Sequence, residues 1–131
     1  MATETQNANN YSIREAGVFG DIQIADEVIA IIAGLAATEV DGVAKMYGNI
    51  TNELVSKLGM KRLSKGVKVL VTPKDVKVDL SIELKYGYSI MQVSAKVQEK
   101  VKQAIETMTG LEVSLVRVRI AGVAVEKEDN V

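Results

Sequence analysis

Hydrophobic and polar residues alternate strictly along residues 76–85. The apolar positions are Val76, Val78, Leu80, Ile82 and Leu84, with polar or charged residues between them. Because successive side chains of a strand point to opposite faces, this pattern predicts a strand with one apolar and one charged face. The stretch is therefore predicted to form the centre of a sheet that has a single buried side.

After residue 89 the apolar residues recur every three or four positions instead, which predicts a helix with one apolar stripe. Ser89 and Gln92 make a capping-box sequence at its start, and Gly110 is suited to end it in a left-handed conformation. The stripe consists of Ile90, Val93, Val97, Val101, Ala104, Ile105 and Met108. We expect the stripe to pack on the apolar face of the central strand.

Another strand is predicted over residues 113–120, with a bulge between Leu115 and Val116 where the phase of the pattern shifts. A strand over residues 67–71 precedes the central strand. Pro73 pre-sets a tight turn between them, so we expect an antiparallel hairpin.

The first half of the chain predicts a strand over residues 18–24, a helix capped by Asp26, a short strand over residues 43–46 and a second helix ended by Gly59. The core stripe of the first helix is predicted at Val28, Ile29, Ile32, Leu35 and Ala36. These elements indicate an α+β fold, a small mostly antiparallel sheet with the helices packed on one face, in two layers.

The other side of the first helix is small and apolar, and almost uncharged. It consists of Ala30, Ile31, Ala33, Gly34 and Ala37. A helix that is apolar all round is buried all round, so either the second helix or another copy of the chain must cover this side. We predict self-association through it, with cover by the second helix as the alternative.

Composition sets the class of protein. The chain has 131 residues, 47% of them hydrophobic, and a net charge of -1, which suits one domain and argues against a dedicated nucleic-acid binder. Residues 1–12 and 126–131 are polar and read as tails, the first of them disordered, around a domain at 13–125. The longest apolar run has ten residues, against about 20 for a membrane span, and the start of the chain is polar; we expect a cytoplasmic protein without direct membrane insertion.

Candidate chemistry is sparse. The chain has no Cys and no His, and no Gly-rich phosphate-binding loop, so we predict no catalytic, cofactor-binding or metal-binding residues. Asp79 and Glu83 share one strand face but are about 13 Å apart, too far for a catalytic carboxylate pair. We expect them to form cross-strand charge pairs with the nearby basic residues, Lys77, Lys85, Arg117 and Arg119.

Basic residues cluster in one stretch of the chain, where they are predicted to contact an anion. They are Lys57, Lys61, Arg62, Lys65 and Lys68. Phosphates of lipid, cofactor or RNA are the ligands considered, and a solvated loop is the alternative. With one Phe, four Tyr and no Trp, the chain offers few stacking platforms for RNA, so nucleic acid is an unlikely partner.

Three groups of residues resemble the alkaline shock protein family, the envelope stress response proteins of Gram-positive bacteria. At the start they are Gly20, Ile22, Ile24, Ala25, Glu27, Val28, Ile29, Glu39, Val40, Gly42 and Val43; in the middle Gly66 to Val69, Tyr86, Gly87, Ser89, Ile90, Val97, Gln98, Val101 and Lys102; at the end Val116, Val118, Gly122 and Val123. The ordered series, rather than any one motif, carries the resemblance.

The resemblance implies an abundant cytoplasmic protein without known catalysis. Some members of the family gather at the membrane through a separate membrane-anchored partner and self-associate, and another branch is associated with fatty-acid synthesis and acetyl-CoA carboxylase. We therefore expect a non-enzymatic scaffold or adaptor that acts through a protein partner, as a homo-oligomer. The alternatives are a regulator of the carboxylase and, third, an RNA-binding module.

Overall fold

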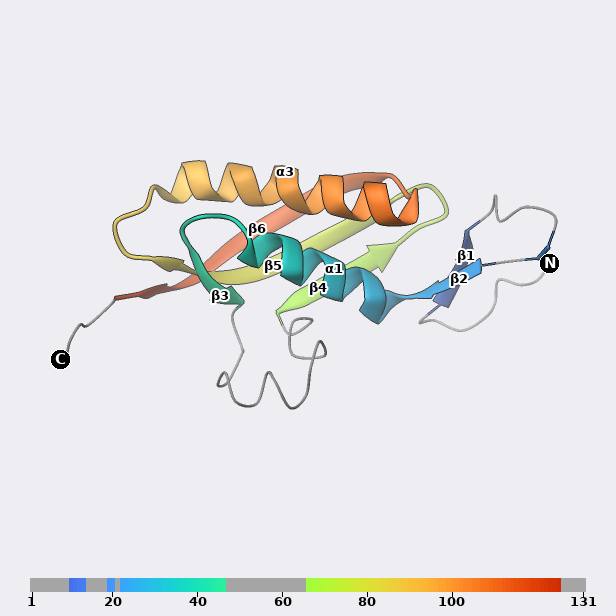
Figure 1. The fold of residues 1–131 in the computed structure, drawn as a ribbon, viewed down its shortest axis with the longest axis horizontal. Coiled ribbons are helices and arrows are strands. Elements are labelled where there is room, and N and C mark those ends of the chain that lie inside the picture. Colours follow the sequence, from blue (N-terminus) through green and yellow to red (C-terminus); the bar gives the residue numbers. More distant parts are fainter. Residues whose placement is uncertain (1–9, 14–18, 21, 47–65, 126–131) are drawn as a thin grey trace.

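The structure is a computed structural model that describes residues 10–13, 19–20, 22–46 and 66–125. Its elements in chain order are β1 (Asn10–Ile13), β2 (Ile22–Ala25), α1 (Asp26–Thr38), β3 (Val43–Met46), β4 (Val67–Val71), β5 (Val76–Lys85), α3 (Ile90–Thr109) and β6 (Val113–Ala124). The fold is α+β, with both helices packed against one side of the main sheet, as predicted (Figure 1). The second predicted helix lies outside the described residues.

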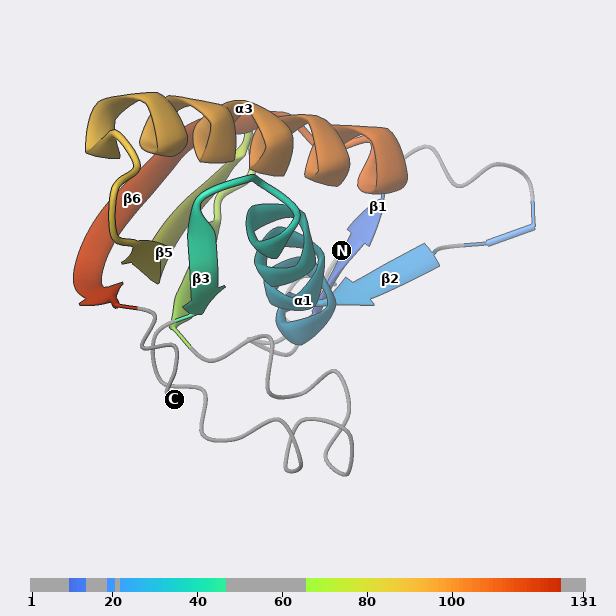
Figure 2. The same cartoon turned by 60° about the vertical axis from the view of Figure 1, so that its left-hand side comes forward.

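Strand β5 is the centre of the main sheet. One edge of β5 pairs antiparallel with β4 along its first half and with β3 near its end, and the other edge pairs with β6 (Figure 2). The β5–β6 pairing is parallel, because α3 carries the chain back before β6 begins. The hairpin of β4 and β5 is confirmed, and the sheet is mostly antiparallel although its longest pairing is not.

A separate two-stranded sheet forms from β1 and β2, which pair antiparallel. Strand β1 begins at Asn10, so the prediction of a disordered tail up to Ser12 is wrong at its end. Backbone pairing with β2 orders this stretch although its sequence shows no alternation. The strand predicted from Val18 is shorter than expected and begins at Ile22.

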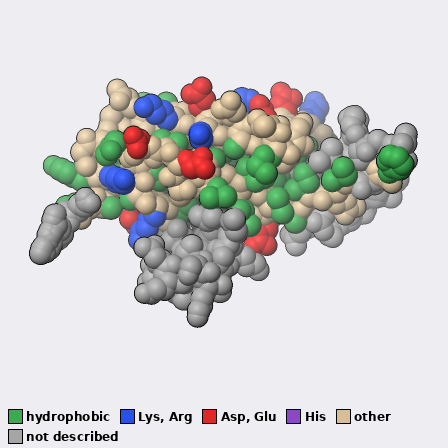
Figure 3. Space-filling model, viewed as in Figure 1, with side chains coloured by type: hydrophobic (Ala, Val, Ile, Leu, Met, Phe, Trp, Pro, Cys, Tyr) green, Lys and Arg blue, Asp and Glu red, His purple; other side chains and the backbone are tan. Residues whose placement is uncertain are grey.

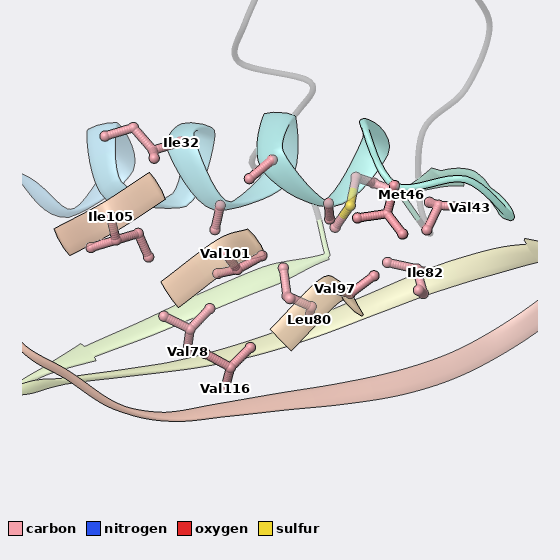
Figure 4. Packing of buried hydrophobic residues seen from close by; sticks show 14 of the residues in the cluster. Ile32, Val43, Met46, Val78, Leu80, Ile82, Val97, Val101, Ile105 and Val116 are labelled. Atoms are coloured by element: carbon pink, nitrogen blue, oxygen red, sulfur yellow. The ribbon is translucent and has the colours of Figure 1, made fainter. Parts of the chain in front are cut away.

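The core lies between the helices and the apolar face of β5. The alternate residues of β5 from Val76 to Leu84 are at most 2% exposed. They face Val97, Val101 and Ile105 of α3 (Figure 4), which confirms the pairing of strand face and helix stripe. The prediction that Ile90 and Met108, at the two ends of the stripe, are buried is wrong, because both side chains are exposed.

Helix α1 buries a face rotated from the predicted one. Val28 and Leu35 were predicted in the core and are exposed, whereas Ala33 and Ala37 are fully buried. Small side chains allow α1 to approach α3 and the main sheet closely, so Ala33 and Ala37 face inward together with Ile29 and Ile32. The N-cap is Ala25 without a side-chain bond, so the prediction of Asp26 as cap is wrong; Asp26 is the first helical residue, and burial raises its pKa.

The ends of α3 match their sequence signals. The Ser89 hydroxyl accepts a hydrogen bond from the Gln92 amide at 3.3 Å, and Gly110 ends the helix in the left-handed region at φ 77°. Gly42 matters beside the start of α3, because its φ is 100° and a Cβ there would lie 2.7 Å from the side chains of Tyr88 and Val93. Only glycine fits that turn.

The bulges of β6 lie beside the predicted position rather than on it. The register with β5 skips Ser114 and Ala121, so the expected bulge between Leu115 and Val116 falls one residue earlier. The outer side of α3 carries charged side chains of both signs (Figure 3). Neither described helix combines the length and hydrophobicity needed to cross a bilayer.

Candidate functional site

The face of the main sheet opposite the helices is the candidate site, and we call it the open face. In register, Lys68 of β4, Asp79 of β5 and Arg117 of β6 form one row across it. The next row toward the end of β5 contains Ser81 and Arg119. The open face follows from the alternation of β5, since the residues between the core positions must point away from the helices.

A hollow of about 360 Å³ lies among these side chains. Its lining consists of Gly66, Val67, Lys68, Asp79, Leu80, Ser81, Arg117 and Arg119. Three of these side chains are basic and one is acidic, so the hollow carries an excess of positive charge although the whole chain is slightly acidic. Such an arrangement attracts an anionic group.

One predicted charge pair is present on the open face. The Arg117 guanidinium lies 3.7 Å from the Asp79 carboxylate, and both side chains are about half or more exposed, at 67% and 48%. This confirms the cross-strand pairing of Asp79. Because exposed pairs contribute about 0–1 kcal/mol, Arg117 is only loosely held and remains available to a ligand.

Of the predicted anion contacts, only Lys68 belongs to the described residues. It lies on the open face, in the hollow. The others, Lys57, Lys61, Arg62 and Lys65, lie outside the part of the chain that the structure describes. Sequence reasoning placed Arg117 and Arg119 in charge pairs and not with Lys68. The parallel pairing of β5 with β6 brings them together, and no pattern in the sequence indicates that pairing directly.

The small-residue side of α1 does not form an exposed surface in the single chain. Ala30, Ala33, Gly34 and Ala37 are buried and Ile31 is half-buried within the single chain. Ala33 and Ala37 pack in the main core with β-strand and α3 residues. Self-association itself is unaffected by this finding and stays a prediction.

Two further carboxylates, those of Glu106 and Asp75, are held by hydrogen bonds within the fold. The Glu106 carboxylate accepts hydrogen bonds from Lys102 Nζ at 2.6 Å and from the Val113 amide at 3.0 Å, and these bonds lower its pKa. Hydrogen bonds from Thr72 and Ser114 lower the pKa of Asp75 in the β4–β5 turn. Both groups fix the start of a strand rather than form a site.

The described residues contain no group of three or more carboxylate, His or Cys side chains placed to hold a metal ion. A second hollow, of about 470 Å³, runs between α3 and the start of β6, where apolar atoms predominate in its lining. Its lining consists of Ala95, Gln98, Glu99, Lys102 and residues 113–116. Both hollows are open to solvent, which suits the binding of a partner's side chains.

Comparison with known proteins identifies a matching family and several related bacterial proteins. Residues 14–125 match the alkaline shock protein 23 family, described as having a cell envelope-related function. The chain is 40% identical to the uncharacterized protein YqhY of Bacillus subtilis over 104 residues, which are 79% of this chain and 77% of that one. It is 29% identical over 127 residues to the stress response regulator gls24 homolog of Streptococcus pyogenes, covering 96% of this chain and 71% of the homolog.

Proposed function

The chain belongs to the alkaline shock protein family, which has a cell envelope-related function, and we propose that it acts there as a non-enzymatic scaffold or adaptor. The observation that carries the proposal is the open face, which presents charged side chains on a rigid, well-packed sheet. Charge displayed on a rigid surface that is open to solvent suits contact with another macromolecule better than enclosure of a small substrate.

We propose a protein partner, one that is membrane-anchored, as the link to the envelope. The chain itself then stays cytoplasmic and reaches the membrane through that partner. The name of the streptococcal homolog, a stress response regulator, supports a role under envelope stress. We also propose that the chain self-associates, through a surface other than the buried side of α1.

Capture from native lysate tests the proposal. Tagged chain should retain membrane proteins, whereas retention of carboxylase subunits would favour the lipid-synthesis alternative and retention of RNA the third class. Purified chain should float with anionic liposomes only when membrane extract is added. Flotation with lipid alone, or capture of no protein at all, would contradict an adaptor that works through a protein partner.

A further inference from the structure

The outer edge of β6 is unpaired among the described residues. Val76 of β5 donates its amide hydrogen to Glu112 on the β6 side, whereas Ser81 donates to Gly66 on the β4 side. Even-numbered residues of β5 therefore bond to β6, and in a parallel ladder they bond to Leu115, Arg117 and Arg119. The N–H and C=O groups of the residues between, Val116, Val118 and Ile120, must point away from the sheet.

One contact verifies this direction. The Gln98 side-chain amide of α3 donates to the Val116 carbonyl at 3.1 Å, which that carbonyl permits only if it points away from β5. No such side-chain partner is present for Val118 or Ile120 in the described part of the chain. The skipped residues Ser114 and Ala121 bound a regular stretch of six residues, long enough to pair with another strand.

Charge next to this edge is positive. Arg117 and Arg119 lie on the open face of the same six residues, and Lys68 lies two strands away. Arg119 and Lys68 have no ion-pair partner among the described residues, and Arg117 has only the loose contact with Asp79. An arriving strand would therefore meet exposed arginine side chains on the open side and, on the helix side, the hollow between α3 and β6.

We propose that the edge of β6 binds an extended acidic segment of a protein partner by strand addition. Backbone groups of Val118 and Ile120 supply the ladder bonds, and Arg117 and Arg119 hold carboxylates of the segment. Because side chains of the added strand alternate, the segment should carry acidic residues at every second position and apolar residues between them, the latter facing the hollow beside Ala95.

A second copy of the chain is a poorer occupant of this edge. Antiparallel pairing of two β6 strands about Val118 would place Arg117 of one copy opposite Arg119 of the other, and like charges directly opposite are destabilising. RNA is also a poorer occupant, because it cannot continue the peptide ladder. The proposal rests on the proposed adaptor role, since it names the surface and the chemistry of the partner.

The test uses the full chain and a labelled peptide of six alternating Glu–Val pairs, followed by fluorescence anisotropy. We expect binding that weakens by about tenfold in Arg119→Glu, as for loss of one charge-assisted contact. Lys96→Glu, a charge reversal on the exposed side of α3, is the matched control and should bind as the wild type. A Lys–Val peptide should not bind.

Hydrogen exchange locates the contact. The amides of Val118 and Ile120 should become protected by the acidic peptide, because only strand addition covers them. Equal binding in Arg119→Glu, binding of the Lys–Val peptide, or protection elsewhere would overturn the proposal. If lysate capture retains the same proteins with Arg119→Glu as with wild type, this surface is wrong while the adaptor role stands; if wild type captures none, the adaptor role itself fails.

Discussion

The two faces of β5 carry the same number of side chains but differ in burial and in the role we assign to them. On the covered face, residues such as Leu80 and Ile82 are at most 1% exposed and lie against both helices. On the open face, Asp79 and Ser81 are half-buried and meet only neighbouring strands and solvent. The covered face therefore contributes most of the stability. The side chains of the open face are less constrained by packing and are available for binding.

The largest effect on the covered side is expected from Gly34→Glu in α1. Gly34 is buried, so the substitution places a carboxylate away from solvent, at a cost of several kcal/mol. We expect loss of the cooperative thermal transition, seen by circular dichroism. A folded chain that sizes as a monomer, beside an oligomeric wild type, would instead place Gly34 in an interface.

The next largest effect is expected from Leu80→Ala at the centre of the covered face. Leu80 is 1% exposed in the core, and a cavity there should lower the free energy of unfolding by about 2–5 kcal/mol. Urea denaturation measures it. Ser81→Ala, the neighbour on the open face, is the control, with an expected change below about 0.5 kcal/mol. Similar losses for the two variants would remove the contrast between the faces.

A smaller, pH-dependent effect is expected from Glu106→Gln at the junction of α3 and β6. Since the pKa of Glu106 is lowered in the folded state, its charge stabilises the fold above the ordinary glutamate pKa, and that contribution is lost as pH falls. The variant should melt below wild type at pH 7, and the two should converge as the pH falls through the lowered pKa of Glu106. Glu99→Gln is the exposed control on the same helix. A melting difference that persists at low pH would show that packing and not charge is responsible.

The smallest effect is expected from Asp79→Ala on the open face. Its contact with Arg117 is exposed, so unfolding free energy should change by about 0–1 kcal/mol in urea denaturation. Asp79 is the one acidic side chain among the described residues that line the hollow, so the acidic peptide should bind the variant more tightly. A large loss of stability would mean that the open face also carries the fold.

The sequence predicted the central strand, the long helix and their packing because their periodic patterns are long and each has one apolar side. It misplaced the buried face of α1, because Val28 and Leu35 outweigh Ala33 and Ala37 in hydrophobicity whereas close packing favours the smaller pair. The sequence also did not predict that Lys68 lies near Arg117 and Arg119. Strand neighbours depend on the path of the chain, and alternation within a strand does not record that path.

The shared edge of β5 has a consequence for how the chain can change during evolution. Met46 at the end of β3 is opposite Ile82, and Val67 at the start of β4 is opposite Leu80. The chain thus leaves the sheet and rejoins it about 7 Å away along one strand. Because both anchor residues are held on β5 by strand pairing, we expect an insertion between Met46 and Val67 to leave the register of β3 and β4 unchanged.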